Sequence, residues 1–349
     1  PVLGDRFDRQ LLKKLKKPEV LALICDSTNV FSESLGRSES SLVNEITSLI
    51  EQQKGAVVAT TFASNVARLL TLATCAQKAG RSVLVLGRAM QTMISNAATV
   101  GLLKNFPPTV SILEALSLPR SNLFILATGS QGEGRAVSAQ LARDKYMDII
   151  LEDGDSFLFS SKTIPGNELA VSKVINLFME RGINVIDDQS GKYHVSGHAN
   201  RPDLSNIHQT FNPKVILPMH GELRHLHEHK QLAVFNGFDS VVVPNGSVLD
   251  IRTDGGAKIV DQVAVGRMYY DGGSLVNASE GIIKSRLQMA ARGHLAISLL
   301  FEKDSILENG IWVKSRGIPR NTDNDLDISQ LIEEALENCP VEAIGDDGS

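Results

Sequence analysis

The sequence predicts an α/β fold, with a mainly parallel sheet in its central part and a smaller α+β region toward its C-terminal end. Two observations carry this prediction. First, short continuous apolar runs alternate with longer stretches in which apolar residues recur at helical spacing, the pattern of βαβ units. Second, two apolar runs end abruptly in a polar side chain, at Asp26 and at His220. Open α/β sheets build their sites at such strand ends, so these two residues are the first functional candidates.

Composition and charge narrow the class of protein further. With 349 residues, of which 42% are hydrophobic and 21% charged, the chain has the composition of a globular protein of two or three domains. No apolar stretch approaches the length of a membrane span and no signal peptide is visible, so we expect no membrane partner. The net charge of -5 excludes a protein that coats nucleic acid through overall positive charge. Any nucleic acid must therefore lie in a local groove.

The cysteines indicate the redox environment. Cys25, Cys75 and Cys339 are widely separated and odd in number. They suit a reducing compartment and form neither a disulfide framework nor a CxxC zinc site, so a cytoplasmic location is expected.

The N-terminal part is expected to hold a basic segment, a strand and a helix. Residues 9–17 (RQLLKKLKK) could bind phosphate, but a solvated helix face is the favoured interpretation. Residues 21–25 are an apolar run typical of a buried strand that leads into Asp26. Residues 38–53 are expected to be helical, because four apolar residues fall at helical spacing.

Strands and helices alternate over residues 50–188. The expected strands are residues 56–60, 83–86, 123–127, 155–160 and 185–186. The expected helices are residues 65–79, 90–100, 134–143 and 168–181, with Asn167 as the cap of the last one. This block should form one mainly parallel sheet, because helical crossovers connect parallel strands.

The pattern changes after residue 188. Residues 215–219 are an apolar run ending at His220-Gly221, typical of a core strand followed by a turn. Shorter strands are expected at residues 241–243, 248–251 and 258–263. The C-terminal part should contain helices 281–292 and 327–338 around strands 295–301 and 311–314. The acidic, glycine-rich residues 341–349 are expected to be disordered.

A candidate phosphate site lies in the sequence HVSGH. His194 and His198 flank Ser196-Gly197, and a Ser-Gly turn exposes backbone N–H groups and a hydroxyl donor. Histidine, with a pKa near neutrality, suits proton transfer to a leaving group. The alternative is a turn that merely carries two exposed histidines.

Asp26 and His220 are candidate metal ligands. A carboxylate at a strand tip binds zinc readily, although aspartate also caps turns, here with Ser27 and Thr28. Imidazole is the commonest ligand of catalytic zinc, although a lone histidine after an apolar run is more often a hydrogen-bonded structural residue.

His225 and His229 have the i, i+4 spacing of a helical zinc pair. No third ligand stands nearby in the sequence, so a helix face without metal is the favoured interpretation.

The sequence TGSQGE, residues 128–133, follows an expected strand and opens an expected helix. Its glycines do not fit the G-x-G-x-x-G spacing of a dinucleotide loop. The loop instead offers backbone donors and the polar side chains of Ser130 and Gln131 to a ligand in a cleft. Phe62, Ser64, Asn65 and Arg68 are expected to line the same cleft, with Arg68 paired to phosphate.

Six short sequences occur in order along the chain: CDSTN, TFASNVARL, TGSQGEGRA, SSKTIPGNE, HVSGHA and PMHGE. Over residues 20 to about 320 the chain resembles the ribonuclease J family, the metallo-β-lactamase nucleases with an inserted β-CASP domain. The resemblance implies a partial metallo-β-lactamase αββα fold, a βαβ-type β-CASP insertion and the start of a C-terminal α+β domain. The implied domains are residues 1–49 and 189–277 (metallo-β-lactamase), 50–188 (β-CASP) and 278–349 (C-terminal).

The resemblance also implies an activity. It is that of a zinc-dependent ribonuclease, a 5′-to-3′ exonuclease that also allows endonuclease cleavage, in RNA processing and decay. It further implies two Zn²⁺ ions and a homodimer or homotetramer formed through the C-terminal domain.

The implied site residues follow from matching sequence positions. Asp26 would bridge the two zinc ions and His220 would ligate one of them. Asp26 and His198 would be catalytic, with His198 protonating the leaving oxygen. His194, Ser196, Gly197 and His198 would bind phosphate, and Ser130, Gln131, Asn65 and Arg68 would face the RNA.

One departure from the family pattern concerns upstream histidines. Family members carry an HxHxDH sequence, whereas no histidine precedes His194 here and the chain begins at Pro1. We therefore expect a fragment that is inactive alone. The alternatives are a non-catalytic RNA-binding or scaffold paralogue and a DNA-processing nuclease. The DNA-specific branch usually has valine at the position of His220, so His220 favours RNA.

Overall fold

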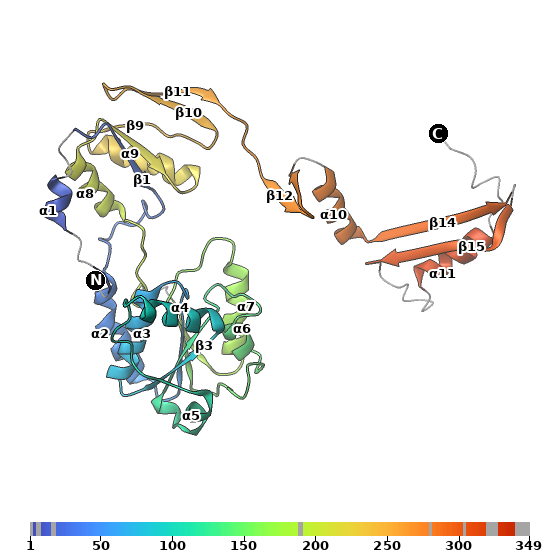
Figure 1. The fold of residues 1–349 in the computed structure, drawn as a ribbon, viewed down its shortest axis with the longest axis horizontal. Coiled ribbons are helices and arrows are strands. Elements are labelled where there is room, and N and C mark those ends of the chain that lie inside the picture. The colour runs from blue at the N-terminus through green and yellow to red at the C-terminus, as the bar shows by residue number, and fades with distance from the viewer. Residues whose placement is uncertain are drawn as a thin grey trace. The chain divides into compact units, whose positions relative to one another are not determined.

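The computed structural model of the chain describes residues 3–4, 8–14, 19–187, 191–278, 281–302, 305–318 and 327–338. The chain divides into two compact units, Pro1–Asp261 and Gln262–Ser349 (Figure 1). The strands of the first unit form a six-stranded sheet, a three-stranded sheet and a hairpin.

The six-stranded sheet has the strand order β4-β3-β5-β2-β6-β7, and all its pairings are parallel. Its strands are β2 (Val57–Thr60), β3 (Ser82–Leu86), β4 (Thr109–Val110), β5 (Leu123–Ala127), β6 (Ser156–Phe159) and β7 (Asn184–Ile186). Every residue of β2, β5 and β6 is buried. Parallel strands covered on both faces read as continuous apolar runs, which is why the sequence pattern revealed them.

Helices cover both faces of this sheet (Figure 1). They are α2 (Val43–Gln52), α3 (Val66–Lys78), α4 (Arg88–Thr99), α5 (Ile112–Ser117), α6 (Val137–Leu141) and α7 (Glu168–Met179), with short 3₁₀ turns η1 (Glu39–Leu42) and η2 (Arg120–Asn122). Val57 packs with α2 and α3 in one core, whereas Val58 packs with α6 and α7 in the other. Side chains alternate across a strand, so each strand of the sheet feeds both cores. The predicted α/β class is confirmed.

Several details of this layer differ from the sequence prediction. The helix expected at residues 134–143 is reduced to α6, and β4 and α5 were not predicted. Asn167 stands at the N-cap position of α7, but its side chain makes no capping hydrogen bond. Its Nδ2 atom donates instead to Gln131 Oε1 at 3.2 Å. The side chain of Asn167 therefore bonds to a residue distant in the sequence and not to the backbone N–H groups at the start of α7.

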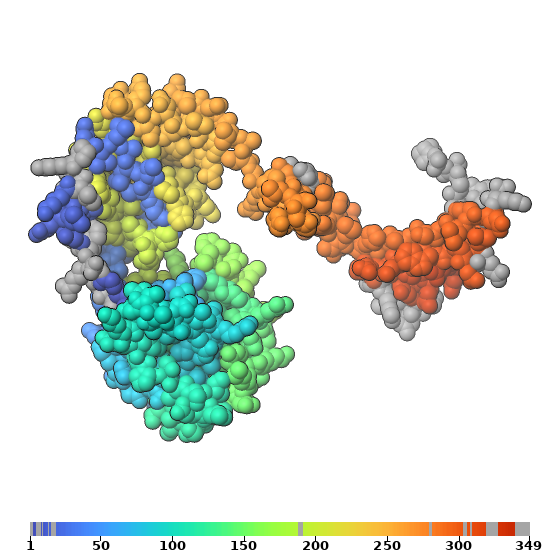
Figure 2. Space-filling model, viewed as in Figure 1, coloured from blue at the N-terminus to red at the C-terminus, as the bar shows by residue number. Residues whose placement is uncertain are grey.

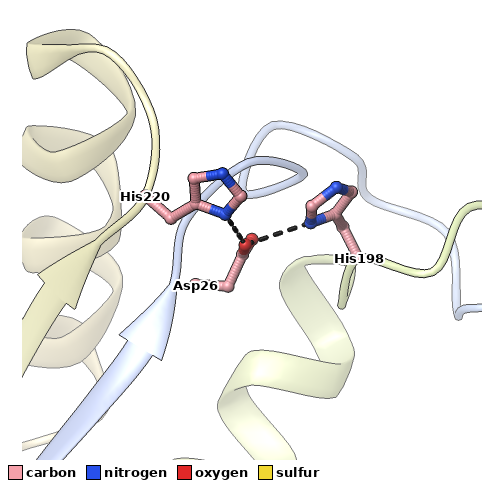
Figure 3. A group of neighbouring side chains, drawn as sticks. All are labelled: Asp26, His198 and His220. Carbon is pink, nitrogen blue, oxygen red and sulfur yellow. Dashed lines mark hydrogen bonds and ion pairs between the residues drawn. The ribbon is translucent and has the colours of Figure 1, made fainter.

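The second layer of this unit is a parallel sheet of β1 (Ala22–Asp26), β8 (Val215–Met219) and β9 (Asp239–Ser240). In Figure 2 a blue surface of the N-terminal part of the chain lies against a yellow surface of later residues, in keeping with the parallel pairing of β1 with β8. Asp26 pairs with Met219, so the carboxyl ends of the two strands bring Asp26 and His220 together (Figure 3).

Helix α8 (Arg201–Phe211) precedes strand β8 along the chain, and helix α9 (Leu223–Phe235) follows it. Helix α8 was not predicted, although Asn200 and Asp203 form a capping box and a proline stands in its first turn. A hairpin of β10 (Ser247–Ile251) and β11 (Ala257–Gln262) follows, while the strand expected at residues 241–243 is absent. The basic segment forms the short helix α1 (Arg9–Lys14), and residues 15–17 lie outside the described part.

The second unit contains the hairpin β12 (Met268–Asp271) and β13 (Ser274–Asn277), helix α10 (Gly281–Arg292), the long hairpin β14 (His294–Glu302) and β15 (Ser305–Arg316), and helix α11 (Ile328–Glu337). Apart from β12 and β13, these elements were predicted. Cys339 and the tail expected to be disordered lie outside the described residues. No helix in the described part is long and apolar enough to cross a membrane.

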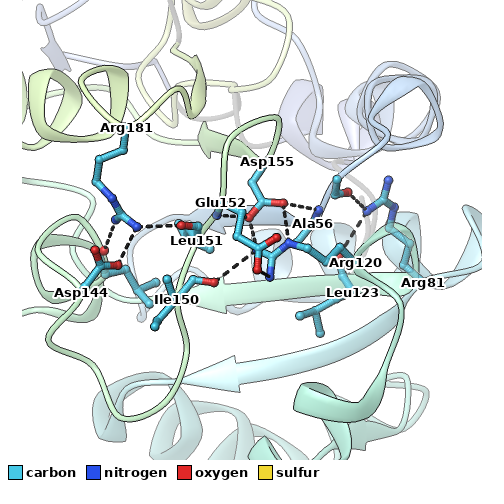
Figure 4. A network of polar contacts seen from close by, with 12 residues as sticks. Ala56, Arg81, Arg120, Leu123, Asp144, Ile150, Leu151, Glu152, Asp155 and Arg181 are labelled. Carbon is cyan, nitrogen blue, oxygen red and sulfur yellow. Dashed lines mark hydrogen bonds and ion pairs between the residues drawn. The ribbon is translucent and has the colours of Figure 1, made fainter.

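A network of polar contacts ties the beginnings of the parallel strands together (Figure 4). The buried carboxylate of Asp155 accepts hydrogen bonds from the backbone N–H of Ala56 and of Glu152, both at 2.8 Å, and pairs with Arg120. Beside it, Arg81 donates to four backbone carbonyl oxygens, those of Ile50, Gln53, Gly55 and Leu123. These side chains satisfy backbone groups that the ends of the strands leave unpaired.

We expect Asp155→Ala to lower the free energy of unfolding by about 3 kcal/mol, because it leaves two backbone N–H groups and a guanidinium without their partner. Urea denaturation of the chain measures this value. Arg252→Ala is the matched control, since its ion pair with Asp254 is exposed and should contribute less than about 1 kcal/mol. Equal losses in the two variants would show that the Asp155 network does not stabilise the sheet.

Candidate active site

Three polar side chains meet at the carboxyl ends of β1 and β8. Asp26 is the last residue of β1, His220 follows β8, and His198 comes from the loop before α8. The Oδ2 atom of Asp26 lies 2.5 Å from His220 Nδ1 and 3.0 Å from His198 Nδ1 (Figure 3). The chain separates His198 from Asp26 by 172 residues, so only the fold creates this cluster.

The backbone around His220 explains how a histidine reaches this position. His220 has φ 55° and Gly221 has φ 148°, so the chain turns sharply after β8. A left-handed conformation is costly for a histidine and persists only where the surroundings hold it. The carbonyl oxygen of His220 accepts a hydrogen bond from Ser27 N–H at 3.2 Å. A Cβ atom on Gly221 would lie 2.9 Å from His225 Cβ, which explains the glycine.

The carboxylate of Asp26 is saturated with donors. Its Oδ1 atom accepts from Thr28 N–H at 2.8 Å, and its Oδ2 atom accepts from the two imidazoles and from Thr28 Oγ1 at 3.3 Å. Burial alone would raise the pKa of Asp26, but the hydrogen bonds from Thr28, His220 and His198 lower that pKa below its ordinary value. The group is therefore ionised at neutral pH. The two alternatives for Asp26 coexist, because it caps the turn and also takes part in the cluster.

The tautomers of the two histidines follow from these contacts. An ionised carboxylate only accepts, so both Nδ1 atoms donate to Asp26. Among the described residues, neither Nε2 atom has a hydrogen-bond partner, and Figure 3 shows both pointing away from Asp26. A neutral imidazole with its proton on Nδ1 presents a bare Nε2 atom, the form that binds a metal ion.

The cluster fits a metal ion chemically. One donor atom from each of Asp26, His198 and His220 lies within 4.8 Å of the others, and the described residues hold this one group of the kind. Two imidazoles and a carboxylate are ligands that zinc accepts. The assignments of Asp26 and His220 as ligands and of Asp26 and His198 as catalytic remain predictions.

The Ser-Gly turn lies directly beside the cluster. Ser196 Oγ accepts the backbone N–H of His198 at 3.1 Å, so this N–H is not free for phosphate. The hydroxyl proton of Ser196 and the N–H of the exposed Gly197 remain as donors, and a Cβ atom on Gly197 would meet nothing within 4 Å. The open space there suits an approaching phosphate.

Asn29 is a site residue that sequence reasoning missed. Its Nδ2 atom donates to the carbonyl oxygen of His198 at 3.3 Å and to Asn200 Oδ1 at 3.0 Å. It therefore fastens the His198 loop to the β1 tip. The signal was present, since Asn29 ends the sequence CDSTN.

His194 lies apart from the cluster. Its Nδ1 atom is 3.1 Å from a guanidinium nitrogen of Arg68, which donates to it. Burial and then the charge of Arg68 lower the pKa of His194 to about 4. Because Nδ1 accepts from Arg68, the neutral ring carries its proton on Nε2, and the role of His194 as a phosphate donor remains a prediction.

Arg68 is the clearest correction to the predicted RNA cleft. Its side chain is 0% exposed and forms a bidentate pair with Glu39 at 2.6 and 2.8 Å, besides donating to Ser160 O at 2.8 Å. The prediction that it pairs with phosphate is wrong, because Glu39 neutralises it inside the fold. Asn65 Oδ1 accepts from Arg68 N–H at 3.1 Å and so caps α3.

Ser130 and Gln131 are also buried. Gln131 Nε2 donates to Lys162 O at 3.1 Å, and its Oε1 atom accepts from Ile164 N–H at 2.8 Å. Gln131 therefore holds the neighbouring loop in place. This corrects the prediction that the two side chains face RNA.

The histidines of α9 do not form a zinc pair. His225 Nδ1 accepts from Glu222 N–H at 3.1 Å, whereas His229 is fully buried between His208 and Ser27. Excluding a metal pair agrees with this geometry, but the expected surface position of His229 is wrong. Burial lowers the pKa of His208 to about 4, and burial together with the nearby His208 lowers that of His229 to about 4.

These buried histidines predict a pH dependence of stability. Their folded-state pKa lies below the ordinary value of 6.5, so the unfolded chain binds more protons between about pH 6.5 and 4. The free energy of unfolding should have its full value above pH 6.5 and fall by on the order of a few kcal/mol as pH drops toward 4.

Urea denaturation across this pH range measures the free energy of unfolding. His208→Leu should flatten the slope, whereas the exposed His227→Ala should keep it; identical slopes in all three proteins would contradict the assignment.

Two family models match parts of the chain. Residues 54–178 match the family model described as "Ribonuclease J, beta-CASP domain", and residues 190–244 match "Zn-dependent metallo-hydrolase RNA specificity domain".

Full-length relatives extend the match over most of the chain. It is 37% identical over 303 residues to the ribonuclease J of Sinorhizobium meliloti, covering 86% of this chain and 54% of that protein. It is 34% identical over 337 residues to the ribonuclease J of Thermus thermophilus, covering 94% and 58%. For the ribonuclease J of Synechocystis sp. the values are 33% over 343 residues, 97% and 53%. The chain spans about half the length of the curated relatives it matches.

Proposed function

Since the chain belongs to the ribonuclease J family, we propose that its gene product is a zinc-dependent ribonuclease. It hydrolyses RNA phosphodiester bonds as a 5′-to-3′ exonuclease and also cleaves internally. The observation that supports this proposal most directly is the cluster of Asp26, His198 and His220 beside the Ser-Gly turn.

His220 would hold a zinc ion through its outward Nε2 atom. Asp26 would fix the ring from the other side, an arrangement in which a carboxylate orients a metal-bound histidine. This orienting role for Asp26 rests on its hydrogen bonds to both imidazoles, and direct ligation through Oδ1, which accepts one hydrogen bond, is the alternative. A bound zinc ion would stabilise negative charge that develops on the phosphate. Two such ions in the gene product remain part of the proposal.

His198 would act on the leaving oxygen. Its Nδ1–H bond to Asp26 fixes the direction of the ring and leaves Nε2 for a proton that it transfers. A carboxylate partner also stabilises the imidazolium that carries this proton. Asp26 is then a positioning residue for both histidines.

Ser196 and Gly197 would bind the phosphate next to His198. The net charge of -5 gives the chain no overall electrostatic attraction for RNA, so uncharged hydrogen-bond donors such as these would hold the phosphate locally. Exposed apolar residues of the second unit, among them Leu287 and Ile297, support a homodimer or homotetramer formed through that unit. The free Cys25 and Cys75 support a cytoplasmic location.

The test of the proposal is cleavage of 5′-monophosphorylated RNA by the complete gene product. We expect mononucleotides to appear from the 5′ end, cleavage to stop after treatment with a chelator, and Zn²⁺ to restore it. The 349-residue chain alone should be inactive. Cleavage that a chelator leaves unchanged would contradict the zinc requirement, and degradation from the 3′ end would contradict the direction.

A further inference from the structure

A buried series of hydrogen bonds connects helices α8 and α9 to the loop that carries Asp26. His208 Nε2 and His229 Nε2 are 3.0 Å apart, and His229 Nδ1 is 2.9 Å from Ser27 Oγ. All three side chains are 0% exposed. Ser27 follows Asp26 directly, and its N–H donates to the carbonyl oxygen of His220. Ser27 therefore contacts the β8 tip through its backbone and helix α9 through its side chain.

The two hydrogen bonds of this series are compatible with neutral rings. Burial lowers the pKa of His208 and of His229 to about 4, so both are neutral near pH 7. Either His208 Nε2–H donates to His229 and His229 Nδ1–H to Ser27 Oγ, or Ser27 Oγ–H donates to His229 Nδ1 and His229 Nε2–H to His208. In both patterns Nδ1 of His229 is bonded to Ser27 and Nε2 to His208.

Simple packing does not explain this arrangement. Two apolar side chains of similar size would fill the space between α8 and α9 without leaving a ring nitrogen unpaired. The polar pair delivers one directed hydrogen bond to Ser27, the residue between Asp26 and Thr28. Thr28 in turn donates to Asp26 Oδ1 through its backbone N–H. The direction of the Ser27 side chain thereby sets the turn that aims the carboxylate.

We propose that His229 is a positioning residue: through Ser27 it holds Asp26 where the carboxylate receives His198 and His220, and His208 holds the other side of the His229 ring. The effect of this role on catalysis rests on the proposed function. The positioning of Asp26 itself is a property of the chain without metal or RNA. This role predicts that the Asp26 contacts to both imidazoles depend on His229, whose hydrogen bonds among the described residues go to Ser27 and His208 and to neither ring.

Two substitutions at one position test the proposal. The amide of His229→Asn lies near the place of Nδ1 and can still reach Ser27, whereas the amide of His229→Gln lies near Nε2 and can reach only His208. Both changes disturb the same buried space, so their melting temperatures should fall alike. With ¹⁵N-labelled histidine, wild type and His229→Asn should show the hydrogen-bonded Nδ1–H signals of His198 and His220, and His229→Gln should lose them.

Metal binding provides a second measurement. Titration of the metal-free complete gene product with Zn²⁺ alone should give an affinity about 10- to 100-fold weaker for His229→Gln than for His229→Asn, the usual loss when a histidine ligand is no longer oriented. Ser27→Ala leaves His229 in place and should reproduce the loss of both Nδ1–H signals. If the His229 variants do not fold, the Ser27→Ala variant tests the proposal by itself.

Retention of both signals in His229→Gln, or their loss in His229→Asn, would overturn the proposal and leave the histidine pair a purely structural role. The nuclear magnetic resonance measurement uses neither RNA nor metal. An inactive gene product with the expected signals would therefore contradict the ribonuclease proposal and support the positioning role.

Discussion

Replacing His220 by alanine should remove zinc from the complete gene product and abolish its ribonuclease activity. His220 is the one imidazole that the left-handed turn after β8 projects from the strand tip with its Nε2 atom outward. The loss should exceed the roughly 10- to 100-fold that follows removal of a group that only orients a ligand. Elemental analysis of the purified protein and cleavage of 5′-monophosphorylated RNA measure the two effects.

Asp26→Asn is the matched comparison, since it keeps the shape of a side chain next to His220 and removes its charge. If Asp26 orients and does not ligate, this variant should bind zinc no more than about 10- to 100-fold more weakly, retain the ion at saturating Zn²⁺, and lose activity. The exposed His227→Ala should retain both. Zinc bound at wild-type level in His220→Ala would remove His220 from the metal site, and zinc lost in Asp26→Asn would make Asp26 a ligand.

Replacing His198 by alanine should reduce cleavage by about 10²–10⁴-fold while zinc stays bound, the usual loss of a general acid. The reason is geometric, because Asp26 holds the Nδ1 side of the ring and leaves Nε2 for the leaving oxygen. RNA with a 5′-bridging phosphorothiolate at the scissile bond has a leaving group that needs no proton. On this substrate His198→Ala should approach the wild-type rate.

Ser196→Ala is the control for phosphate binding. It should also keep zinc but should show no preferential recovery on the sulfur substrate, because it removes a donor to phosphate and no acid. A His198→Ala protein without zinc would make His198 a ligand. Equal defects of His198→Ala on both substrates would mean that His198 binds phosphate without protonating the leaving group.

The sequence was sufficient for the architecture because the signals involved are local. Buried parallel strands such as β2 and β5 are continuous apolar runs, and helix α2 shows its buried face as apolar residues at helical spacing. The same logic identified Asp26 and His220, since a polar residue that ends an apolar run must stand at a strand tip. Elements without such a signal, such as the two-residue β4, were missed.

The roles of individual polar residues were decided by the tertiary structure, because their partners lie far away in the sequence. Arg68 pairs with Glu39, 29 residues away, and His229 bonds to Ser27, 202 residues away. The sequence does not show whether a charged or polar side chain faces solvent or a buried partner. That partner is supplied by the packing of elements that are distant in the sequence. The sequence alone therefore determined the α/β class and the strand-tip residues. The fold determined that Arg68 and Gln131 are structural and that His229 is buried against Ser27, next to Asp26.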